Sequence, residues 1–276
     1  MTPLGLIAGN GQFPLLLAEE ARRQGKPVVA VAIEEETDPG LESHVDAIHW
    51  VGLGPIKKTI RLFRQEGVEE AVMAGQVKHT QIFRRLRLDT TAIRIWATLR
   101  DKKTDTILAA VAEEFAKSGV RFLPSTTYLR HLLAPEGFLT SARPSAAQRK
   151  DVEFGFKTAK AVAGLDVGQT VCVKDQAVLA VEAMEGTDAC IRRAGTLTDG
   201  WFTAAKVAKP RQDIRFDIPV IGLGTIKSLR GSKAAVLAVE AGKTLFFDKE
   251  TFLKDAGELK LVVVGLPSDG ILCPRD

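Results

Sequence analysis

The sequence predicts an α/β protein with an N-terminal Rossmann-like parallel-sheet domain and a second α/β domain. Short apolar runs alternate with helical patterns through the first half, as in repeated β-α-β units. A Pro-, Gly- and Ser-rich stretch at 134–148 interrupts this periodicity, and strand patterns dominate afterwards. We therefore expect a first domain at 1–133, a linker at 134–148 and a catalytic α/β domain at 149–276.

The first domain is expected to open with a buried strand at 4–8, a Gly-rich turn, and a helix at 14–24 that Gly25 closes. The continuous apolar run at 28–33 is typical of a central parallel strand. The remaining expected elements are strands at 49–53, 71–74 and 120–123 and helices at 56–65 and 106–118.

The second domain is expected to begin with a helix at 149–163. Apolar runs then predict six strands, at 170–174, 177–183, 203–208, 218–221, 234–239 and 260–264. Two further helices are expected, at 188–193 and 226–230.

Composition narrows the functional classes. The chain has 276 residues, 45% hydrophobic and 26% charged, which is typical of a globular protein. Its net charge of +4 suits an anionic substrate or an anionic membrane surface, while an aromatic content of 6% argues against nucleic acid. Three scattered cysteines favour neither disulfides nor zinc and suggest a reducing cytoplasm.

Several common catalytic motifs are missing from the sequence. It contains no Gly-x-Ser-x-Gly, no His-Glu-x-x-His and no Walker Gly-Lys-Thr. Serine acyl transfer, zinc peptidase and P-loop chemistry are therefore not expected.

The turn Gly9-Asn10-Gly11-Gln12 follows the first strand and opens a helix. Backbone N–H groups at a helix N-terminus attract phosphate, and glycines allow close approach. A dinucleotide fingerprint would carry a third glycine where Pro14 stands. The turn is a candidate site for a nucleotide or sugar phosphate, with NAD binding and an empty structural turn as alternatives.

Two further segments of the first domain carry candidate residues. Gln76 and Lys78 follow the strand at 71–74, at the sheet edge where open α/β sheets bind ligands. An ordinary loop is the alternative there. Asp105 stands before a predicted helix, either as an N-cap or as an acid of a metal or phosphate site.

An acidic cluster in the second domain combines Glu182, Glu185 and Asp188 around a Gly186-Thr187 turn. Three acids this close repel unless a cation or basic groups neutralise them. Mg²⁺ prefers one or two carboxylates together with phosphate oxygens and waters. Thr187 is expected to cap the next helix and to offer its hydroxyl to a phosphate. The cluster points to phosphate chemistry, with a solvated, well-capped turn as the alternative.

Basic residues and one isolated acid follow. Lys206 and Lys209 straddle a strand end and are candidates for phosphate binding, or a solvated pair. Asp217 stands between Phe216 and Ile218 in an apolar stretch. A carboxylate within an apolar strand is costly unless it is paired or metal-bound. Asp217 is therefore the leading candidate for a catalytic or metal-binding acid.

Together these segments resemble the LpxI type of UDP-2,3-diacylglucosamine pyrophosphatase, from Gly5 to about Val264. The segments that carry the resemblance are Gly-Leu-Ile-Ala-Gly-Asn-Gly-Gln-Phe-Pro at 5–14, Ala-Gly-Gln-Val at 74–77, the acid at Asp105, Leu-Asp-Val-Gly-Gln at 165–169, the acidic stretch 182–188, Lys-Val-Ala-Lys-Pro at 206–210 and Asp-Ile-Pro-Val-Ile-Gly at 217–222.

The resemblance implies a Mg²⁺-dependent hydrolase of lipid A biosynthesis. It would cleave the pyrophosphate of UDP-2,3-diacylglucosamine to UMP and 2,3-diacylglucosamine 1-phosphate (lipid X). The family places its ligand in a cleft between two domains, with Asp217 matching the catalytic acid and water attacking the sugar-side phosphorus. The chain departs from the family pattern at Thr104, Gln76 and Arg211, which affects the expected phosphate contacts more than the reaction.

These observations lead to specific assignments. The expected catalytic residues are Asp217, Glu185, Asp188 and Asp105. The expected Mg²⁺ ligands are Asp217, Glu182, Glu185 and Asp188. The expected substrate-binding residues are Gly9, Asn10, Gly11, Gln12, Gln76, Lys78, Thr187, Lys206 and Lys209.

The acyl chains of the implied substrate bear on location. Each buried CH₂ contributes about 0.8 kcal/mol, which holds such a lipid in a membrane or a deep apolar groove. We therefore expect a cytoplasmic protein that contacts the inner-membrane surface, binds no nucleic acid, and has a homodimer as one option for its assembly. Two rival functions remain: an NAD-dependent oxidoreductase using Gly9 to Gly11, and a non-catalytic UDP-sugar-sensing regulator.

Overall fold

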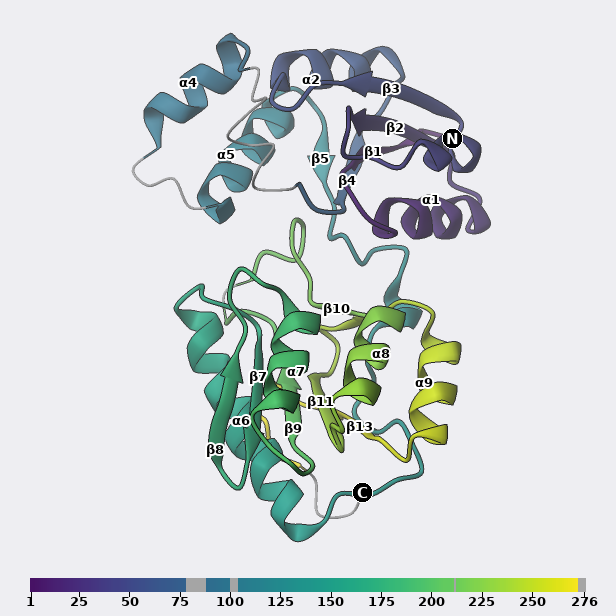
Figure 1. Ribbon diagram of the computed structural model, residues 1–276. Coiled ribbons are helices and arrows are strands. Elements are labelled where there is room, and N and C mark those ends of the chain that lie inside the picture. The colour runs from purple at the N-terminus through teal and green to yellow at the C-terminus, as the bar shows by residue number, and fades with distance from the viewer. Residues whose placement is uncertain (78–87, 100–103, 211, 273–276) are drawn as a thin grey trace. The chain divides into compact units, whose positions relative to one another are not determined.

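The computed structural model describes residues 1–77, 88–99, 104–210 and 212–272 (Figure 1). The chain forms two compact units. The first unit comprises Met1–Arg130 together with Asp213–Asp217, and the second comprises His131–Gln212 and Ile218–Asp276. Each unit combines a sheet with helices, so the expected α/β class is confirmed. The ligand cleft expected between the domains stays a prediction.

The first unit is built on a five-stranded, all-parallel sheet in the order β3-β2-β1-β4-β5. All six residues of β2 are buried, as its continuous apolar run predicts. The strands are β1 (Leu4–Ala8), β2 (Val28–Ile33), β3 (Ala47–Val51), β4 (Glu70–Ala74) and β5 (Arg121–Phe122).

Helices cover both faces of this sheet, with α1 and α2 on opposite sides (Figure 1). Phe63 of α2 and Phe115 of α5 meet in one core cluster, with their ring centroids 6.3 Å apart. The helices are α1 (Phe13–Arg23), the 3-10 helix η1 (Pro39–His44), α2 (Ile56–Gln65), α4 (Thr90–Thr98) and α5 (Thr104–Lys117). Of these, η1 and α4 were not expected from the sequence.

A short segment from the second half of the sequence belongs to the first unit. Ser125 donates from both its backbone N and its Oγ to the carbonyl oxygen of Ile214, each at 2.9 Å. The ring of Phe216 packs on that of Phe122, with centroids 6.2 Å apart. These contacts place the turn Asp213–Asp217 on the core of the first unit.

The second unit contains a six-stranded sheet in the order β6-β13-β11-β9-β7-β8. Its three central strands run parallel, while β6 and β7 run antiparallel to their neighbours. The strands are β6 (Gly137–Phe138), β7 (Thr170–Lys174), β8 (Ala177–Val181), β9 (Thr203–Lys206), β11 (Val236–Glu240) and β13 (Val262–Leu266). A separate parallel pair joins β10 (Val220–Ile221) and β12 (Leu245–Phe246).

Residues 134–148, expected to form a linker, are part of the second unit. Gly137 of β6 pairs with Gly265 of β13, which adds this segment to the sheet. Ser145 caps helix α6 through a capping box with Gln148. The Pro-, Gly- and Ser-rich composition therefore reflects a short edge strand and a helix cap.

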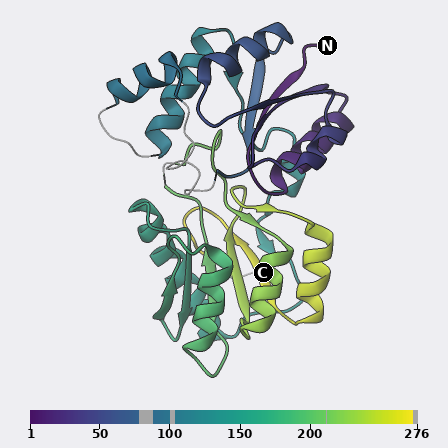
Figure 2. The same ribbon diagram turned by 45° about the horizontal axis from the view of Figure 1, so that its top comes forward.

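Side chains alternate between two cores along the strands of the second unit. Val171 and Val173 of β7 pack with Phe156 of α6, whereas Cys172 packs with Ile191 of α7. Helix α6 thus covers one face, and α7, α8 and α9 cover the other (Figure 2). The helices are η2 (Arg130–Leu132), α6 (Ala146–Gly164), α7 (Thr187–Thr196), α8 (Leu223–Gly231) and α9 (Lys249–Glu258). No helix among the described residues has the length and apolar character needed to cross a bilayer.

Candidate functional site

In the first unit, the predicted residues at the ends of β1 and β4 lie side by side. These two strands are neighbours in the sheet, so their carboxyl ends meet at one edge. Gly9 donates its N–H to Ala74 at 2.8 Å, and Asn10 and Gln76 exchange backbone hydrogen bonds of 2.7 and 3.1 Å. The structure therefore brings Gly9, Asn10 and Gln76 together, as their positions after parallel strands predict.

Close backbone approach explains two glycines at this edge. A Cβ on Gly9 would lie 2.6 Å from the carbonyl oxygen of Gln76, and one on Gly75 would lie 2.6 Å from that of Asn10. Gly75 also has a φ of +91°, in the left-handed region that favours glycine. These glycines hold the two loops together, whatever ligand the edge accepts.

Gly11 and Gln12 are exposed beside this junction, at the start of α1. Gln12 is the N-cap of the helix and makes no side-chain cap hydrogen bond. The N-terminal end of a helix carries partial positive charge, which favours an anion. Of the other predicted residues in this unit, Lys78 lies outside the described residues. Asp105 lies in α5, and its side chain is likewise outside the description.

In the second unit, Lys206 is the centre of a polar cluster at the carboxyl end of β9. Alternation along β9 directs Lys206 to the same face as Ala204, toward α7. Its side chain is 5% exposed, and Nζ donates to Thr187 Oγ1 at 2.5 Å. Thr187 in turn donates to Glu182 Oε1 at 3.0 Å and accepts from Thr170 Oγ1 at 3.4 Å. We call Lys206, Thr187, Glu182 and Thr170 the Lys206 cluster.

The role expected for Thr187 as a helix cap is wrong. Helix α7 has Gly186 at its N-cap, with a φ of +82°, and no side chain caps it. The hydroxyl of Thr187 is used between Lys206 and Glu182 instead. The unusual turn expected at Gly186 is present, and it places Thr187 in the first turn of α7.

Glu185 is engaged apart from the Lys206 cluster. Its Oε1 lies 2.6 Å from Arg193 Nη2, and its Oε2 accepts from the backbone N of Ala183 at 3.1 Å. A hydrogen bond from its own backbone N–H, followed by the Arg193 guanidinium, holds the pKa of Glu185 below its ordinary value. Glu185 is therefore a charged, partnered and exposed carboxylate.

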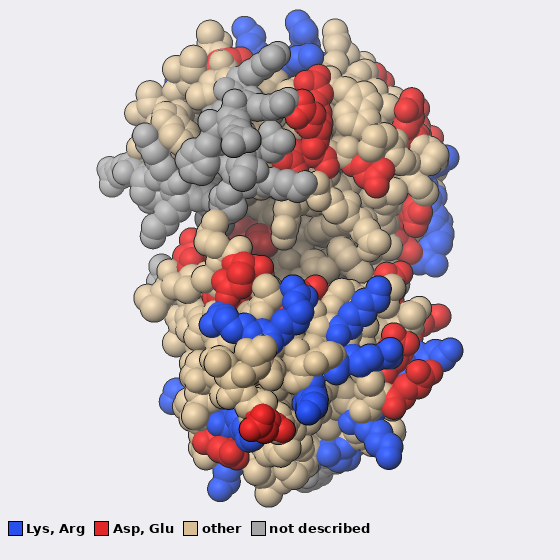
Figure 3. All heavy atoms as spheres, viewed as in Figure 1, with Lys and Arg blue, Asp and Glu red and all other residues tan. Residues whose placement is uncertain are grey.

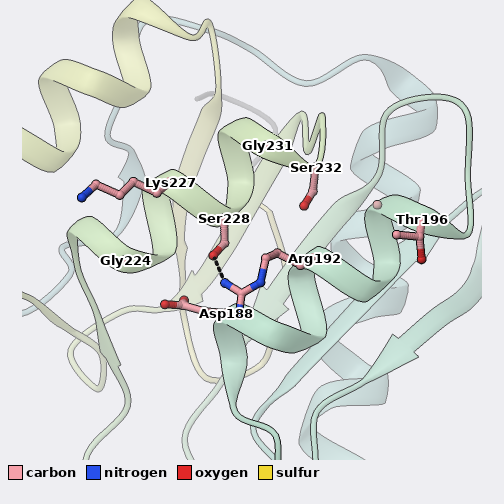
Figure 4. Close-up of a pocket in the computed structure, with 9 residues that line it drawn as sticks. Asp188, Arg192, Thr196, Gly224, Lys227, Ser228, Gly231 and Ser232 are labelled. Carbon is pink, nitrogen blue, oxygen red and sulfur yellow. Dashed lines mark hydrogen bonds between the residues drawn. The ribbon is translucent and has the colours of Figure 1, made fainter.

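Asp188 lies in a groove of about 510 Å³ between α7 and α8 (Figure 4). Its Oδ2 is close to the first turn of α8, because a Cβ on Gly224 would lie 2.7 Å from it. Arg192 and Ser228 also line the groove, and Arg192 Nη1 donates to Ser228 Oγ at 2.8 Å. Lys and Arg side chains recur over the face that these helices cover (Figure 3).

The acidic stretch is therefore not arranged as a shared metal site. Glu182 contacts Thr187, Glu185 contacts Arg193, and Asp188 faces α8. Within the described ranges, no three His, Cys, Asp or Glu side chains are grouped so that they could hold a metal ion. The assignment of these acids and Asp217 as Mg²⁺ ligands stays a prediction.

Asp217 lies at the end of the turn Asp213–Asp217 and is half-buried. The strand expected at 218–221 is observed at Val220–Ile221, so Asp217 precedes β10. The backbone N of Asp217 donates to the carbonyl oxygen of Asp213 at 3.2 Å. Arg215 lies 2.6 Å from the Asp213 carboxylate and lowers the pKa of Asp213 through its hydrogen bonds. The turn is held by its own ion pair and by the Phe216 anchor.

Lys209 has a different partner from Lys206. Its Nζ lies 2.6 Å from Asp166 Oδ1, and its backbone N donates to Gln212 Oε1 at 2.7 Å. Asp166 lies in the 165–169 turn, and its pairing with Lys209 was not expected from the sequence. The ion pair between the part-buried Lys160 and the fully buried Glu240 was also not expected. The sequence does show a charged residue in α6 and another at the end of the apolar strand β11.

Comparison with known proteins identifies the family. Residues 3–132 match the LpxI N-terminal domain, and residues 135–264 match the LpxI C-terminal domain. The chain belongs to the LpxI family. The UDP-2,3-diacylglucosamine pyrophosphatase LpxI of Caulobacter vibrioides is 31% identical over 277 residues, covering 96% of this chain and 98% of that protein. The resemblance inferred from the sequence motifs is thereby confirmed.

Two solved structures illustrate distant likenesses of fold. Precorrin-6A reductase CobK aligns over 97% of this chain and 88% of its own, with 14% identity and a TM-score of 0.29. N5-carboxyaminoimidazole synthetase from Staphylococcus aureus, complexed with ADP, aligns over 62% of this chain and 32% of its own, with 12% identity and a TM-score of 0.28. Neither likeness bears on function.

Proposed function

We propose that this chain hydrolyses the pyrophosphate bond of UDP-2,3-diacylglucosamine and releases UMP and lipid X, a step of lipid A biosynthesis. Membership of the LpxI family over both domains carries the proposal. The full-length match to a pyrophosphatase of that name supports the substrate.

The Lys206 cluster supports diphosphate binding in the second unit. A nearly buried ammonium stands beside a hydroxyl in the first turn of α7. The ammonium and the positive end of the helix both favour an anionic ligand at this edge. We assign Lys206, Thr187 and Lys209 to the diphosphate oxygens, where fixed positive charge offsets the charge that grows on the leaving phosphate.

The first unit supports binding of the nucleotide portion. Its strand order β3-β2-β1-β4-β5 reverses direction between β1 and β4, and doubly wound sheets bind ligands at such a switch point. Gly11 and Gln12 are exposed there, beside the joined loops of Gly9, Asn10 and Gln76. We propose a Rossmann-like role for this edge, with these residues next to the uridine phosphate.

Asp217 is proposed to orient or deprotonate the attacking water. A half-buried carboxylate at the end of an anchored turn suits this role, since its position is fixed by Phe216 and Ser125. Glu185, Asp188 and Asp105 are weaker candidates for acid–base work. Replacing Asp217 by Asn should leave folding intact and remove most turnover.

A requirement for Mg²⁺ is also proposed, although the acids at 182–188 do not form one ion site. Mg²⁺ is commonly held by one or two carboxylates together with substrate phosphates, and when bound it neutralises charge on phosphoryl oxygens. The acyl chains of the substrate favour contact with the inner-membrane surface of a cytoplasmic enzyme.

The test is to incubate purified protein with UDP-2,3-diacylglucosamine and to quantify UMP, with Mg²⁺ and with excess EDTA. We expect UMP with Mg²⁺, loss of it with EDTA, and loss of it in Asp217→Asn. Tight UDP-sugar binding without UMP release would refute the hydrolase and favour the regulator. Calorimetric binding of NAD would favour the oxidoreductase.

A further inference from the structure

Glu240 is a fully buried carboxylate that the proposed function leaves unused. It is the last residue of β11 and is 0% exposed. Alternation along β11 directs it to the same face as Ala238, toward α6. Its carboxylate accepts hydrogen bonds from four donor groups. These are Lys160 Nζ at 2.9 Å, Lys243 Nζ at 2.9 Å, Ser268 Oγ at 3.0 Å and the backbone N of Ala208 at 2.9 Å.

This arrangement keeps a buried charge ionised. Burial raises the pKa of Glu240, but hydrogen bonds from Lys243 and Lys160 outweigh it and hold the pKa below the ordinary value. A buried ion pair is weak support for overall stability, because replacing it by well-packed apolar residues is often neutral or favourable. Such pairs are better explained by the geometry they impose.

The geometry imposed here is that of the two peptide groups on either side of Ala208. Ala208 donates its N–H to Glu240 Oε2 at 2.9 Å, while its carbonyl oxygen accepts from Lys160 Nζ at 2.9 Å. The ion pair therefore holds both polar groups of a single residue. Ala208 stands two positions after Lys206 and one before Lys209.

Ala208, held at both of its backbone polar groups, lies between the two lysines. Before it, Lys206 ends β9 and reaches Thr187 on the α7 side of the sheet. After it, Lys209 reaches Asp166 in the turn that follows α6. A backbone rotation at Ala208 would move Lys206 and Lys209 relative to each other, so the ion pair restrains the backbone spacing of the two lysines.

We propose that Lys160 and Glu240 are positioning residues that fix the 206–209 segment for a sugar–nucleotide diphosphate. This rests on the proposed function, in which Lys206 and Lys209 bind the diphosphate. Lys160 and Glu240 act through the backbone N–H and carbonyl of Ala208 and have no contact with the substrate themselves.

Lys243 provides a matched control. It donates to the same carboxylate at 2.9 Å, but no hydrogen bond joins its side chain to Ala208. Lys160→Met and Lys243→Met therefore each remove one cation from Glu240, and only the first also releases the Ala208 carbonyl. Steady-state UMP release gives kcat and KM for each variant, and thermal unfolding reports their stability.

We expect Lys160→Met to lower kcat/KM about tenfold or more, and Lys243→Met to change it less than about threefold, at similar unfolding temperatures. In a Lys209→Met background, Lys160→Met should cost less than it does alone, since part of its effect passes through Lys209. Equal losses in the two variants, or a full additional loss in the double variant, would overturn the proposal.

Glu240→Gln gives a second reading if Lys160→Met does not fold. Its side chain keeps the shape and one acceptor oxygen, so it should fold, and we expect a loss of kcat/KM that again exceeds that of Lys243→Met. A Glu240→Gln protein with unaltered kcat/KM would contradict the inference. Absence of UMP release by the unaltered protein would instead refute the proposed function, so the two failures are distinguishable.

Discussion

Replacement of Thr187 by Val tests the Lys206 cluster directly. The two side chains have nearly the same shape, but Val lacks the hydroxyl that accepts from Lys206 at 2.5 Å and donates to Glu182 at 3.0 Å. A hydrogen bond to a charged group contributes about 1.5–3 kcal/mol, and here the ammonium is 5% exposed. We expect a loss of this size in the free energy of unfolding.

Thermal unfolding measures this loss. For a domain of this size, 1 kcal/mol corresponds to roughly 2–4 °C, so Thr187→Val should unfold about 3–12 °C below the unaltered protein. Thr187→Ser keeps the hydroxyl and should stay within about 2 °C, since it loses one methyl group at a half-buried position. UMP release should fall in Thr187→Val and be largely kept in Thr187→Ser. If Thr187→Val unfolded at the same temperature as the unaltered protein, the Thr187 hydroxyl would not stabilise the Lys206 cluster.

Three further predictions concern the loops and the buried acid. Gly75→Ala should lower the unfolding temperature more than Gly11→Ala. Both glycines have φ above +90°, but only at Gly75 would the added Cβ meet the carbonyl oxygen of Asn10, at 2.6 Å. Equal decreases in unfolding temperature would show that this contact has no cost. Phe216→Ala should reduce kcat/KM about tenfold or more by releasing the turn that carries Asp217, and Phe216→Leu should restore part of it. The pKa of Glu240 is lower in the folded protein than in the unfolded chain, where it is about 4.3. The ionised carboxylate therefore stabilises the fold above that pH, and this stabilisation is lost as the pH falls through the pKa of the folded state. Glu240→Gln should make the free energy of unfolding less dependent on pH in the acid range.

The sequence was most informative where periodicity was strong. The apolar face of α2 and the short apolar run of β7 predict both elements with the bounds observed, Ile56–Gln65 and Thr170–Lys174. By contrast, α4 and α9 were not expected. In α9 the pattern KETFLKDAGE contains few apolar residues, of which Phe252 and Ala256 are buried, so its period is hard to detect.

Side-chain partners were less predictable than elements. The spacing of Glu182, Glu185 and Asp188 suggested convergence, but the turn at Gly186 and the first turn of α7 direct them to different neighbours. Thr187 has the residue type of a cap, yet the tertiary contact with Lys206 uses its hydroxyl instead. Such competition between local and long-range partners cannot be read from a short motif.

The buried pair of Lys160 and Glu240 shows the same limit. The two residues are 80 positions apart, and their contact depends on α6 crossing the end of β11. A sequence pattern reveals each charge as out of place on an apolar face, but only the fold shows that they neutralise each other.

The most direct test of the central claim compares two lysines of the second unit. Lys206 lies at the carboxyl end of β9, while Lys174 lies at the opposite end of the sheet, where its Nζ donates to Thr198 Oγ1 at 2.9 Å. With UDP-2,3-diacylglucosamine as substrate, we expect Lys206→Met to lower kcat/KM for UMP release by about 100-fold or more, and Lys174→Met to lower it by less than about threefold. Retention of activity in Lys206→Met would contradict the assignment of the diphosphate to the Lys206 cluster.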